Sequence, residues 1–330
     1  MSMDKAESLR DAVARLRAGG VVAFPTETVY GLGADARNEA AVRRVFALKG
    51  RPADHPLIVH VTGRAAAGQW AAELTETARV LMTRFWPGPL TLVLPVRDEV
   101  SRVVTGGQDS VALRAPRHPV AQALLGGFGG GLAAPSANPF GRVSPTEAGH
   151  VRVCFPGLAV LDGGPCRLGL ESTIVSLLDD PPRVLRPGAL PLSALRQALG
   201  GRTIETAGAD QSAPRVPGTL PAHYAPATPL EIVVADQVIP RARALLAAGF
   251  RVAVLRRHRG PWRPPLLLHG FLLPDGPVAY GRQLYARLRE IDRFGFDRLL
   301  VEAPPQDEAW WAVNDRLARA ARHYPEEISR

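Results

Sequence analysis

A break in the apolar patterning at residues 201–229 constrains the fold of this chain more than any other feature. The segment is rich in Pro, Gly, Ala and Thr, and it lacks the apolar spacing typical of helices and strands. The sequence therefore predicts a linker here, between one domain at residues 1–200 and another at 230–330. The length of 330 residues also favours two domains.

The first part, residues 1–200, predicts an α+β domain on a mixed sheet. Helical spacing is present between Ala6 and Leu16, over 40–48 and around Leu74–Leu81, so helices occur irregularly rather than one after each strand. That order is typical of an α+β domain and not of a strictly doubly wound fold. Short apolar runs predict strands at 21–24, 57–61, 90–96, 111–114, 132–134, 159–161, 173–177 and 183–185.

The last part, residues 230–330, alternates strand-like and helix-like segments. Strands are predicted at 231–235, 252–255 and 298–302, and helices at 239–248, 278–291 and 308–321. Regular alternation of this kind predicts a small parallel α/β domain, because parallel neighbours need a crossover connection that is usually a helix.

The composition points to a cytoplasmic protein. Two cysteines cannot form a disulfide framework, and Cys154 and Cys166 lack the spacing of zinc ligands. The longest apolar runs are much shorter than the roughly 20 residues of a membrane span. The N-terminal residues contain acids and no apolar core, so we expect no signal peptide and no membrane association.

The net charge of +9 has two explanations at this stage. Of the 40 basic residues only Lys5 and Lys49 are lysines, and this arginine excess beside abundant Ala, Gly and Pro resembles a coding bias. The alternative is a surface for a polyanion such as RNA.

Familiar catalytic signals are missing from the sequence. Gly129-x-Gly131-x-x-Ala134 matches a dinucleotide fingerprint in form, but it precedes a predicted strand instead of joining a strand to a helix. We find no Walker A motif, no GxSxG elbow and no HExxH pair. The chemistry must therefore come from a different arrangement of residues.

Polar residues gather at strand ends and turns, where a purely structural segment would be apolar. Arginines, one lysine and many hydroxyls together suit the recognition of a polyphosphate. The segments are PTETVYGLG at 25–33, LKGRP at 48–52, PLIVH at 56–60, SVALRAP at 110–116, APSANPFGRVSPT at 134–146, GLEST at 169–173, LRPG at 185–188 and PGTLPAHYAP at 217–226.

In this order, these motifs resemble the threonylcarbamoyl-AMP synthase family in its long form. The resemblance implies a YrdC-like domain on a mixed twisted sheet, followed by a linker and a smaller Rossmann-like α/β domain. It also implies synthesis of L-threonylcarbamoyladenylate and pyrophosphate from ATP, L-threonine and bicarbonate. Mg²⁺ is expected to accompany ATP, and the product is expected to pass to a tRNA threonylcarbamoyl transferase complex.

The same resemblance assigns roles to individual residues. Lys49 and Arg51 are the expected catalytic residues, and no metal ligands are expected. His55 stands where the family usually has Asn, and Ala134 where a hydroxyl residue is common. The expected threonine-side contacts are Thr28, His60, Arg114, Ser172 and Thr173. The expected ATP-side contacts are Arg51, His55, Ser110, Ser136, Asn138, Ser144, Arg186 and Tyr224.

Three further expectations concern the linker and rival functions. His223 and Tyr224 are unusual in a solvent-exposed spacer, so we expect residues 212–227 to act as a lid over the nucleotide. One rival function is that of a double-stranded RNA-binding ribosome-maturation factor without synthase activity, and weak RNA binding remains open in either case. The other is a related carbamoyl-transfer domain, which is normally fused to a larger partner.

Overall fold

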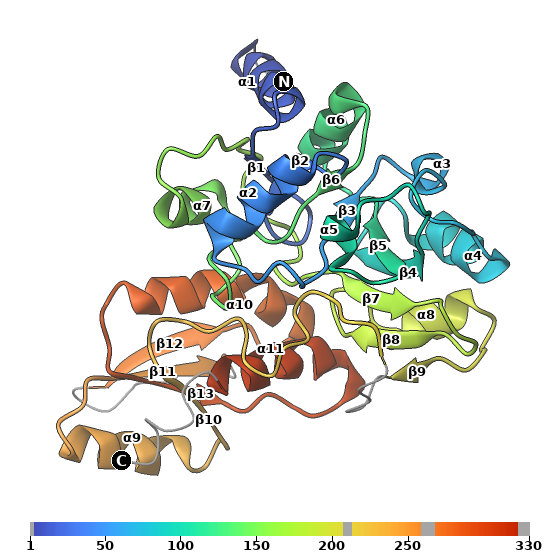
Figure 1. The fold of residues 1–330 in the computed structure, drawn as a ribbon. Coiled ribbons are helices and arrows are strands. Elements are labelled where there is room, and N and C mark those ends of the chain that lie inside the picture. The colour runs from blue at the N-terminus through green and yellow to red at the C-terminus, as the bar shows by residue number, and fades with distance from the viewer. Residues whose placement is uncertain (1–2, 207–212, 259–267, 323–330) are drawn as a thin grey trace. The chain divides into compact units, whose positions relative to one another are not determined.

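The computed structural model describes residues 3–206, 213–258 and 268–322, which divide into two compact units (Figure 1). The first unit lies within Met1–Phe140 and Pro145–Thr219, and the second within Gly141–Ser144 and Leu220–Arg330. The division between 219 and 220 falls inside the segment that the sequence predicts as a linker. Gly141–Ser144 belongs to the second unit, although it is part of the polar segment 134–146 and includes the expected ATP-side residue Ser144.

The described residues of the first unit form one mixed sheet in the order β1-β2-β6-β3-β5-β4-β7-β8-β9 (Figure 1). Pairing is parallel at β3/β5, β4/β7 and β8/β9 and antiparallel elsewhere. The predicted α+β class on a mixed sheet is confirmed. The strands are β1 (Val22–Phe24), β2 (Gly31–Asp35), β3 (Ile58–His60), β4 (Leu90–Pro95), β5 (Ser110–Arg114), β6 (Leu132–Ala133), β7 (Thr173–Ser176), β8 (Arg183–Arg186) and β9 (Glu205–Thr206).

Strand β1 is buried on both faces, which explains its uninterrupted apolar run. Val22 and Phe24 pack in one cluster with Leu16 and Leu124, whereas Ala23 packs in another cluster with residues of α2 and α7. The helices of this unit are α1 (Met3–Arg17), α2 (Glu39–Lys49), α3 (Arg64–Ala67), α4 (Glu76–Phe85), α5 (Arg102–Thr105), α6 (Pro119–Phe128), α7 (Ala148–Cys154) and α8 (Leu192–Ala198).

Helix α2 has sharply defined ends, and these place the basic segment that follows it. The Asn38 side chain accepts a hydrogen bond from the Ala41 N–H at 3.1 Å at the N-terminus. Gly50 ends the helix in the left-handed conformation, with φ of 62°. The chain therefore turns sharply between Lys49 and Arg51.

Three segments of the first unit differ from the predicted strands. Strand β2 pairs with β1 and β6 in a segment for which no strand is predicted. Residues 159–161 contribute an isolated parallel bridge between Val160 and Ala23 rather than a strand, because the chain meets β1 at only that one position. Strand β9 pairs with β8 inside the segment predicted as a linker. Its side chains are partly buried or exposed, so no apolar pattern marks it in the sequence.

The second unit is a parallel sheet in the order β10-β13-β11-β12, as the alternating pattern predicts (Figure 1). The crossovers β10–α9–β11 and β12–α10–β13 run in opposite directions along the sheet, so right-handed connections place α9 and α10 on opposite faces. The elements are β10 (Leu230–Val233), α9 (Val238–Ala247), β11 (Val252–Arg257), β12 (His269–Leu273), α10 (Pro277–Asp292), β13 (Arg298–Glu302), the 3₁₀ turn η1 (Glu308–Trp310) and α11 (Trp311–Ala321).

Candidate active site

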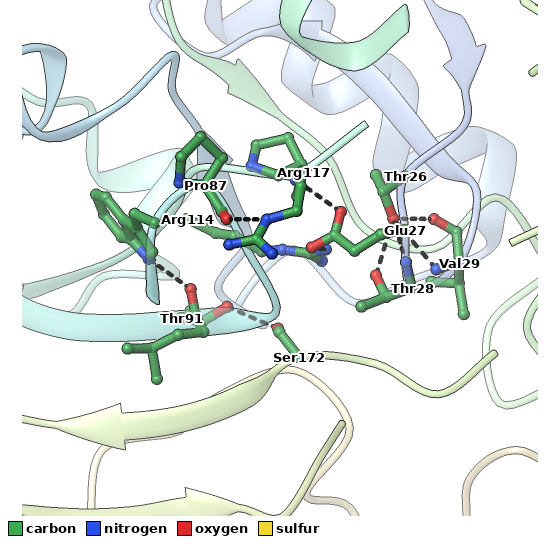
Figure 2. A network of polar contacts seen from close by, with 12 residues as sticks. Thr26, Glu27, Thr28, Val29, Pro87, Thr91, Arg114, Arg117 and Ser172 are labelled. Carbon is green, nitrogen blue, oxygen red and sulfur yellow. Dashed lines mark hydrogen bonds and ion pairs between the residues drawn. The ribbon is translucent and has the colours of Figure 1, made fainter. Parts of the chain in front are cut away.

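The turn after β1 is built from a local hydrogen-bond network of threonine side chains (Figure 2). The Thr26 hydroxyl donates to the Val29 carbonyl at 2.6 Å and accepts from the Thr28 N–H at 3.1 Å. Thr26 and Thr28 also share a hydrogen bond of 2.8 Å between their hydroxyls. This network fixes a short Ser/Thr-type turn, and the predicted threonine-side residue Thr28 is fully buried within it.

Glu27 in the same turn forms a buried ion pair with Arg114 at the end of β5 (Figure 2). The distance from Arg114 Nη2 to Glu27 Oε1 is 2.7 Å, and the two side chains are 4% and 5% exposed. The second carboxylate oxygen of Glu27 accepts a hydrogen bond of 2.8 Å from the Arg117 N–H. Both oxygens of the carboxylate are therefore engaged, and two segments distant in sequence are joined.

The sheet register aligns His60, Arg114 and Thr91 across three neighbouring strands. His60 on β3 and Thr91 on β4 are each directly opposite Arg114 on β5. Directly opposite residues project to the same face of a sheet, so the three side chains form one polar row. An apolar strand end would be expected here if the segment served packing alone.

His60 and Arg114 each carry a buried nitrogen that lacks a hydrogen-bond partner among the described residues. These atoms are His60 Nδ1 and Arg114 Nε. Burial, and then the charge of Arg114, lower the pKa of His60 to about 3, so its imidazole is neutral at physiological pH. Buried polar atoms are normally satisfied, and the two orphaned nitrogens therefore suit a polar ligand.

Thr91 connects the polar row to Ser172 and through it to Arg186 (Figure 2 labels Thr91 and Ser172). The hydroxyls of Thr91 and Ser172 are 2.7 Å apart. Arg186 Nη2 donates to the Ser172 carbonyl at 2.8 Å and to its hydroxyl at 3.3 Å, while Nη1 donates to the Pro217 carbonyl at 2.8 Å. A predicted threonine-side residue and a predicted ATP-side residue are thus in direct contact.

Thr173 has a different environment from its neighbour Ser172. Its hydroxyl donates to the Leu190 carbonyl at 2.6 Å and accepts from the Leu190 N–H at 3.1 Å. These two bonds fasten the loop before α8 to β7.

Lys49 and Arg51 lie on either side of the turn at Gly50, and both are buried. Lys49 Nζ donates to the carbonyls of Ser136 and Asn138, which ties the end of α2 to that loop. Burial, and then the charge of Arg51, lower the pKa of Lys49 well below its usual value. The pair is therefore a desolvated basic site rather than a solvated helix end.

Arg51 is oriented by the segment that follows it and by an aromatic ring. Its Nη2 donates to the Pro56 carbonyl at 2.9 Å, and its guanidinium lies 5.6 Å from the centre of the Phe140 ring. His55 packs edge-on against the same ring at 5.4 Å. Burial, and then the Arg51 charge, lower the pKa of His55. The neighbouring Asp54 pairs with Arg215 at 3.3 Å and not with Arg51.

The remaining predicted ATP-side residues are divided between the units. Ser110 and Arg114 lie at opposite ends of β5, which places their Cα atoms roughly 13 Å apart for a strand rise of about 3.3 Å per residue. Ser136 forms a bridge with Gly31, and the Asn138 amide donates to the Pro139 carbonyl at 2.7 Å. Ser144 and Tyr224 belong to the second unit.

Tyr224 is buried inside the second unit, at 2% exposure. Its ring stacks on Tyr285 at 5.9 Å, and the Arg316 guanidinium lies 4.8 Å from its centre. Its backbone is in the left-handed region, with φ of 61°, which is uncommon for a residue other than glycine. Backbone strain of this kind is often retained at functional positions. The contact with ATP that is expected of Tyr224 stays a prediction.

Thr26, Glu27 and Thr91 also occupy the site, although none of them is among the residues predicted from the sequence. Glu27 lies inside the motif PTETVYGLG and Thr91 inside the predicted strand 90–96, but no local pattern distinguishes them. Only the strand pairing of β4 with β5 and the approach of the turn to Arg114 bring them into the polar row.

Within residues 3–206, 213–258 and 268–322, no three His, Cys, Asp or Glu side chains are grouped so that they would hold a metal ion. Over the same residues, no helix has the length and apolar character needed to cross a membrane.

Comparison with known proteins gives matches to both parts of the chain. Residues 14–188 match the family described as "Telomere recombination", whose members are named Sua5, YciO and YrdC. Residues 190–322 match the family described as "Threonylcarbamoyl-AMP synthase, C-terminal domain".

Individual relatives match nearly the whole chain. The threonylcarbamoyl-AMP synthase of Pyrococcus abyssi is 42% identical, over 95% of this chain and 94% of its own. The synthase of Bacillus subtilis is 38% identical, over 95% and 92%. The crystal structure of P. abyssi Sua5 complexed with L-threonine superposes with a TM-score of 0.88 at 40% identity, covering 98% of this chain and 96% of that one.

Proposed function

Because the chain belongs to the threonylcarbamoyl-AMP synthase family, we propose that it forms L-threonylcarbamoyladenylate and pyrophosphate from L-threonine, bicarbonate and ATP. The protein is accordingly a nucleotidyltransferase. The observation that carries the proposal is the 42% identity with a named synthase across 95% of the chain. The named relatives support the synthase and not the RNA-binding alternative.

Threonine as substrate is supported by the related structure that contains it and by the polar row of this chain. The Arg114 guanidinium matches a carboxylate in shape and charge, and its Nε is buried without a partner among the described residues. The neutral His60 offers a hydrogen-bonding nitrogen without adding charge. Thr28 and Ser172 add hydroxyls from two other segments.

We assign ATP to the basic residues of the first unit that lie outside the polar row. Arg51 and Arg186 supply guanidinium groups, which bind phosphate oxygens in a forked geometry. Lys49, His55, Ser110, Ser136 and Asn138 are the other members of this set in the first unit. Mg²⁺ would enter with ATP, held mainly by phosphate oxygens and water, as is usual for this ion at nucleotide sites.

The proposed reaction proceeds in two steps. Bicarbonate takes up a proton and releases water to give carbon dioxide. The threonine amine, in its neutral form, attacks the carbon of carbon dioxide and then loses an N–H proton, which leaves a carbamate. A carbamate oxygen then attacks the α-phosphorus of ATP, and the bond to the bridging oxygen of pyrophosphate breaks. Such a transfer depends on in-line positioning and on charge stabilisation, which arginine and lysine supply without a protein nucleophile. We propose that a tRNA-modifying transferase consumes the adenylate.

The test measures pyrophosphate release from ATP and bicarbonate with and without L-threonine. We expect release to depend on threonine, and formation of the adenylate to accompany it. Serine, which keeps the hydroxyl but lacks the methyl group, should be a poor substrate. 2-Aminobutyrate should be a worse one, because a site that hydrogen-bonds a hydroxyl rejects an analogue that lacks it more strongly than one that lacks a methyl group. Pyrophosphate release that is equally fast without threonine would contradict the proposal.

A further inference from the structure

Glu27 is held in place by its own backbone as well as by its carboxylate. The hydroxyl network of Thr26 and Thr28 fixes the turn around it (Figure 2). The Glu27 carbonyl also accepts a hydrogen bond of 2.8 Å from the Leu168 N–H. The position of this side chain is therefore set before any substrate binds.

The carboxylate in turn restricts the Arg114 guanidinium. A guanidinium has five N–H donors, and Nη2 donates to Glu27 Oε1 at 2.7 Å. Nε remains without a hydrogen-bond partner among the described residues. Arg114 is thus fixed at one edge and retains a buried donor for another group.

Burial makes this restriction necessary. At 4% exposure, an arginine without a counter-charge would be strongly disfavoured, and its long side chain would move toward solvent. Glu27 Oε2 bonds to the Arg117 N–H at 2.8 Å, so the carboxylate itself cannot follow Arg114 in such a movement.

We propose that Glu27 is a positioning residue for the amino-acid substrate, because it holds Arg114 with its unpaired edge toward the substrate carboxylate. The inference rests on the proposed function and adds a residue to its threonine subsite. It predicts that Glu27 governs the affinity for threonine and contributes little to the affinity for ATP.

Two substitutions separate orientation from charge. Glu27→Gln removes a negative charge near a bound carboxylate, so a purely electrostatic role would lower the KM for threonine. Loss of orientation would raise it instead, because the Gln amide cannot accept from both Arg114 and the Arg117 N–H. Glu27→Asp keeps the charge but is one methylene too short to reach both partners.

We expect both variants to raise the KM for L-threonine about 10- to 100-fold, the usual range for a lost charged hydrogen bond, with the KM for ATP nearly unchanged. Wild type should also prefer L-threonine to L-threoninol, which lacks the carboxylate, and Glu27→Gln should lose much of that preference. Adding Glu27→Gln to Arg114→Gln should have little further effect, because both changes remove the same contact.

Glu302→Gln is the matched control. Glu302 is also a buried acid paired with an arginine, at 2.7 Å from Arg256, but it lies in the second unit. We expect it to lower the melting temperature without changing the KM for threonine. Equal losses toward threonine, threoninol and ATP in Glu27→Gln, together with a lowered melting temperature, would reduce Glu27 to a structural residue and overturn the inference.

Calorimetric titration with L-threonine separates this inference from the proposed function. If wild type binds threonine but releases no pyrophosphate, the proposed function fails, and the comparison of binding by wild type and Glu27→Gln still decides the role of Glu27. Unchanged threonine binding in Glu27→Gln overturns the inference alone. A wild type that binds no threonine overturns both.

Discussion

Buried charges at the candidate site are each held by named partners rather than by solvent. Glu27 balances Arg114, and the carbonyls of Ser136 and Asn138 accept from Lys49. Burying a charge is costly unless it is paired or hydrogen-bonded, so these contacts are what allow such residues inside the fold. Each therefore has a measurable consequence when a single side chain is changed.

Arg51→Ala should lower pyrophosphate release by two to three orders of magnitude, because loss of a charged group at a phosphate site typically costs about 2–4 kcal/mol of transition-state stabilisation. We expect the fold to persist, as judged by circular dichroism. Arg97→Ala is the control, since Arg97 is an exposed arginine paired with Glu99 on the surface. Near-normal turnover in a folded Arg51→Ala protein would place Arg51 outside the active site.

Acid should destabilise the protein partly through His60. The pKa of His60 is lowered to about 3 in the fold, so between about pH 6.5 and pH 3 the unfolded state takes up a proton that the folded state does not. Above about pH 6.5 this group does not change the free energy of unfolding. Between about pH 6.5 and pH 3, the free energy of unfolding falls by about 1.4 kcal/mol for each pH unit.

The measurement is the free energy of unfolding in denaturant at pH 7.5 and at pH 5.0. We expect wild type to lose about 2 kcal/mol more than His60→Gln between these values. The same loss in both proteins would show that the imidazole is protonated, or exposed, in the folded state.

At the scale of elements, the segment after residue 212 is attached to the first unit by several contacts. Gln108 bonds to both the N–H and the carbonyl of Arg215, at 2.8 and 3.0 Å. The Arg215 side chain reaches Asp54, and Val216 is buried against the sheet beside Ile58 and Leu185. Residues 213–217 are therefore held against the first unit by these contacts. Residue 212, which also belongs to the predicted lid, lies outside the described residues.

The predicted lid is tested by protease nicking within 212–227, with and without an ATP analogue plus threonine. We expect strong protection by the ligands in wild type, because a closed segment excludes the protease as it excludes water. Protection should be largely lost in Tyr224→Ala. Cleavage that the ligands leave unchanged would make this segment a passive tether.

At the scale of the whole molecule, the net charge of +9 is spread over both units. Several surface arginines pair with acids, as in Arg102–Asp109 and Arg152–Asp162. Exposed pairs of this kind contribute little to stability and are screened by salt. The charge therefore favours a general attraction to polyanions over a specific site.

We expect pyrophosphate formation to proceed without RNA, and RNA affinity to be weak, independent of threonine and steeply reduced by salt. Filter binding at 50 and 200 mM salt, with and without threonine, measures this. An activity that requires RNA, or RNA binding that persists at high salt, would revive the RNA-binding alternative.

Sequence patterns were sufficient for many of the local elements and for the class of each domain, although β2, α6 and α8 were not predicted. Asn38 and Gly50 mark the ends of α2, and the apolar run of β1 reflects burial on both faces. Strand β12 escaped prediction because two of its residues, His269 and Gly270, are exposed and carry no apolar alternation. The order of the motifs along the chain also identified the family, because each motif is a run of consecutive residues that can be recognised without the fold.

The tertiary structure alone decided which of these motifs meet. His60, Arg114 and Thr91 become neighbours only through strand register, a long-range property that local spacing does not encode. Glu27 gains its place from a turn that reaches the end of β5, and Thr173 uses its hydroxyl on the backbone of Leu190. The sequence by itself determined which side chains carry the chemistry, and the packing of distant segments determined which of them face one another.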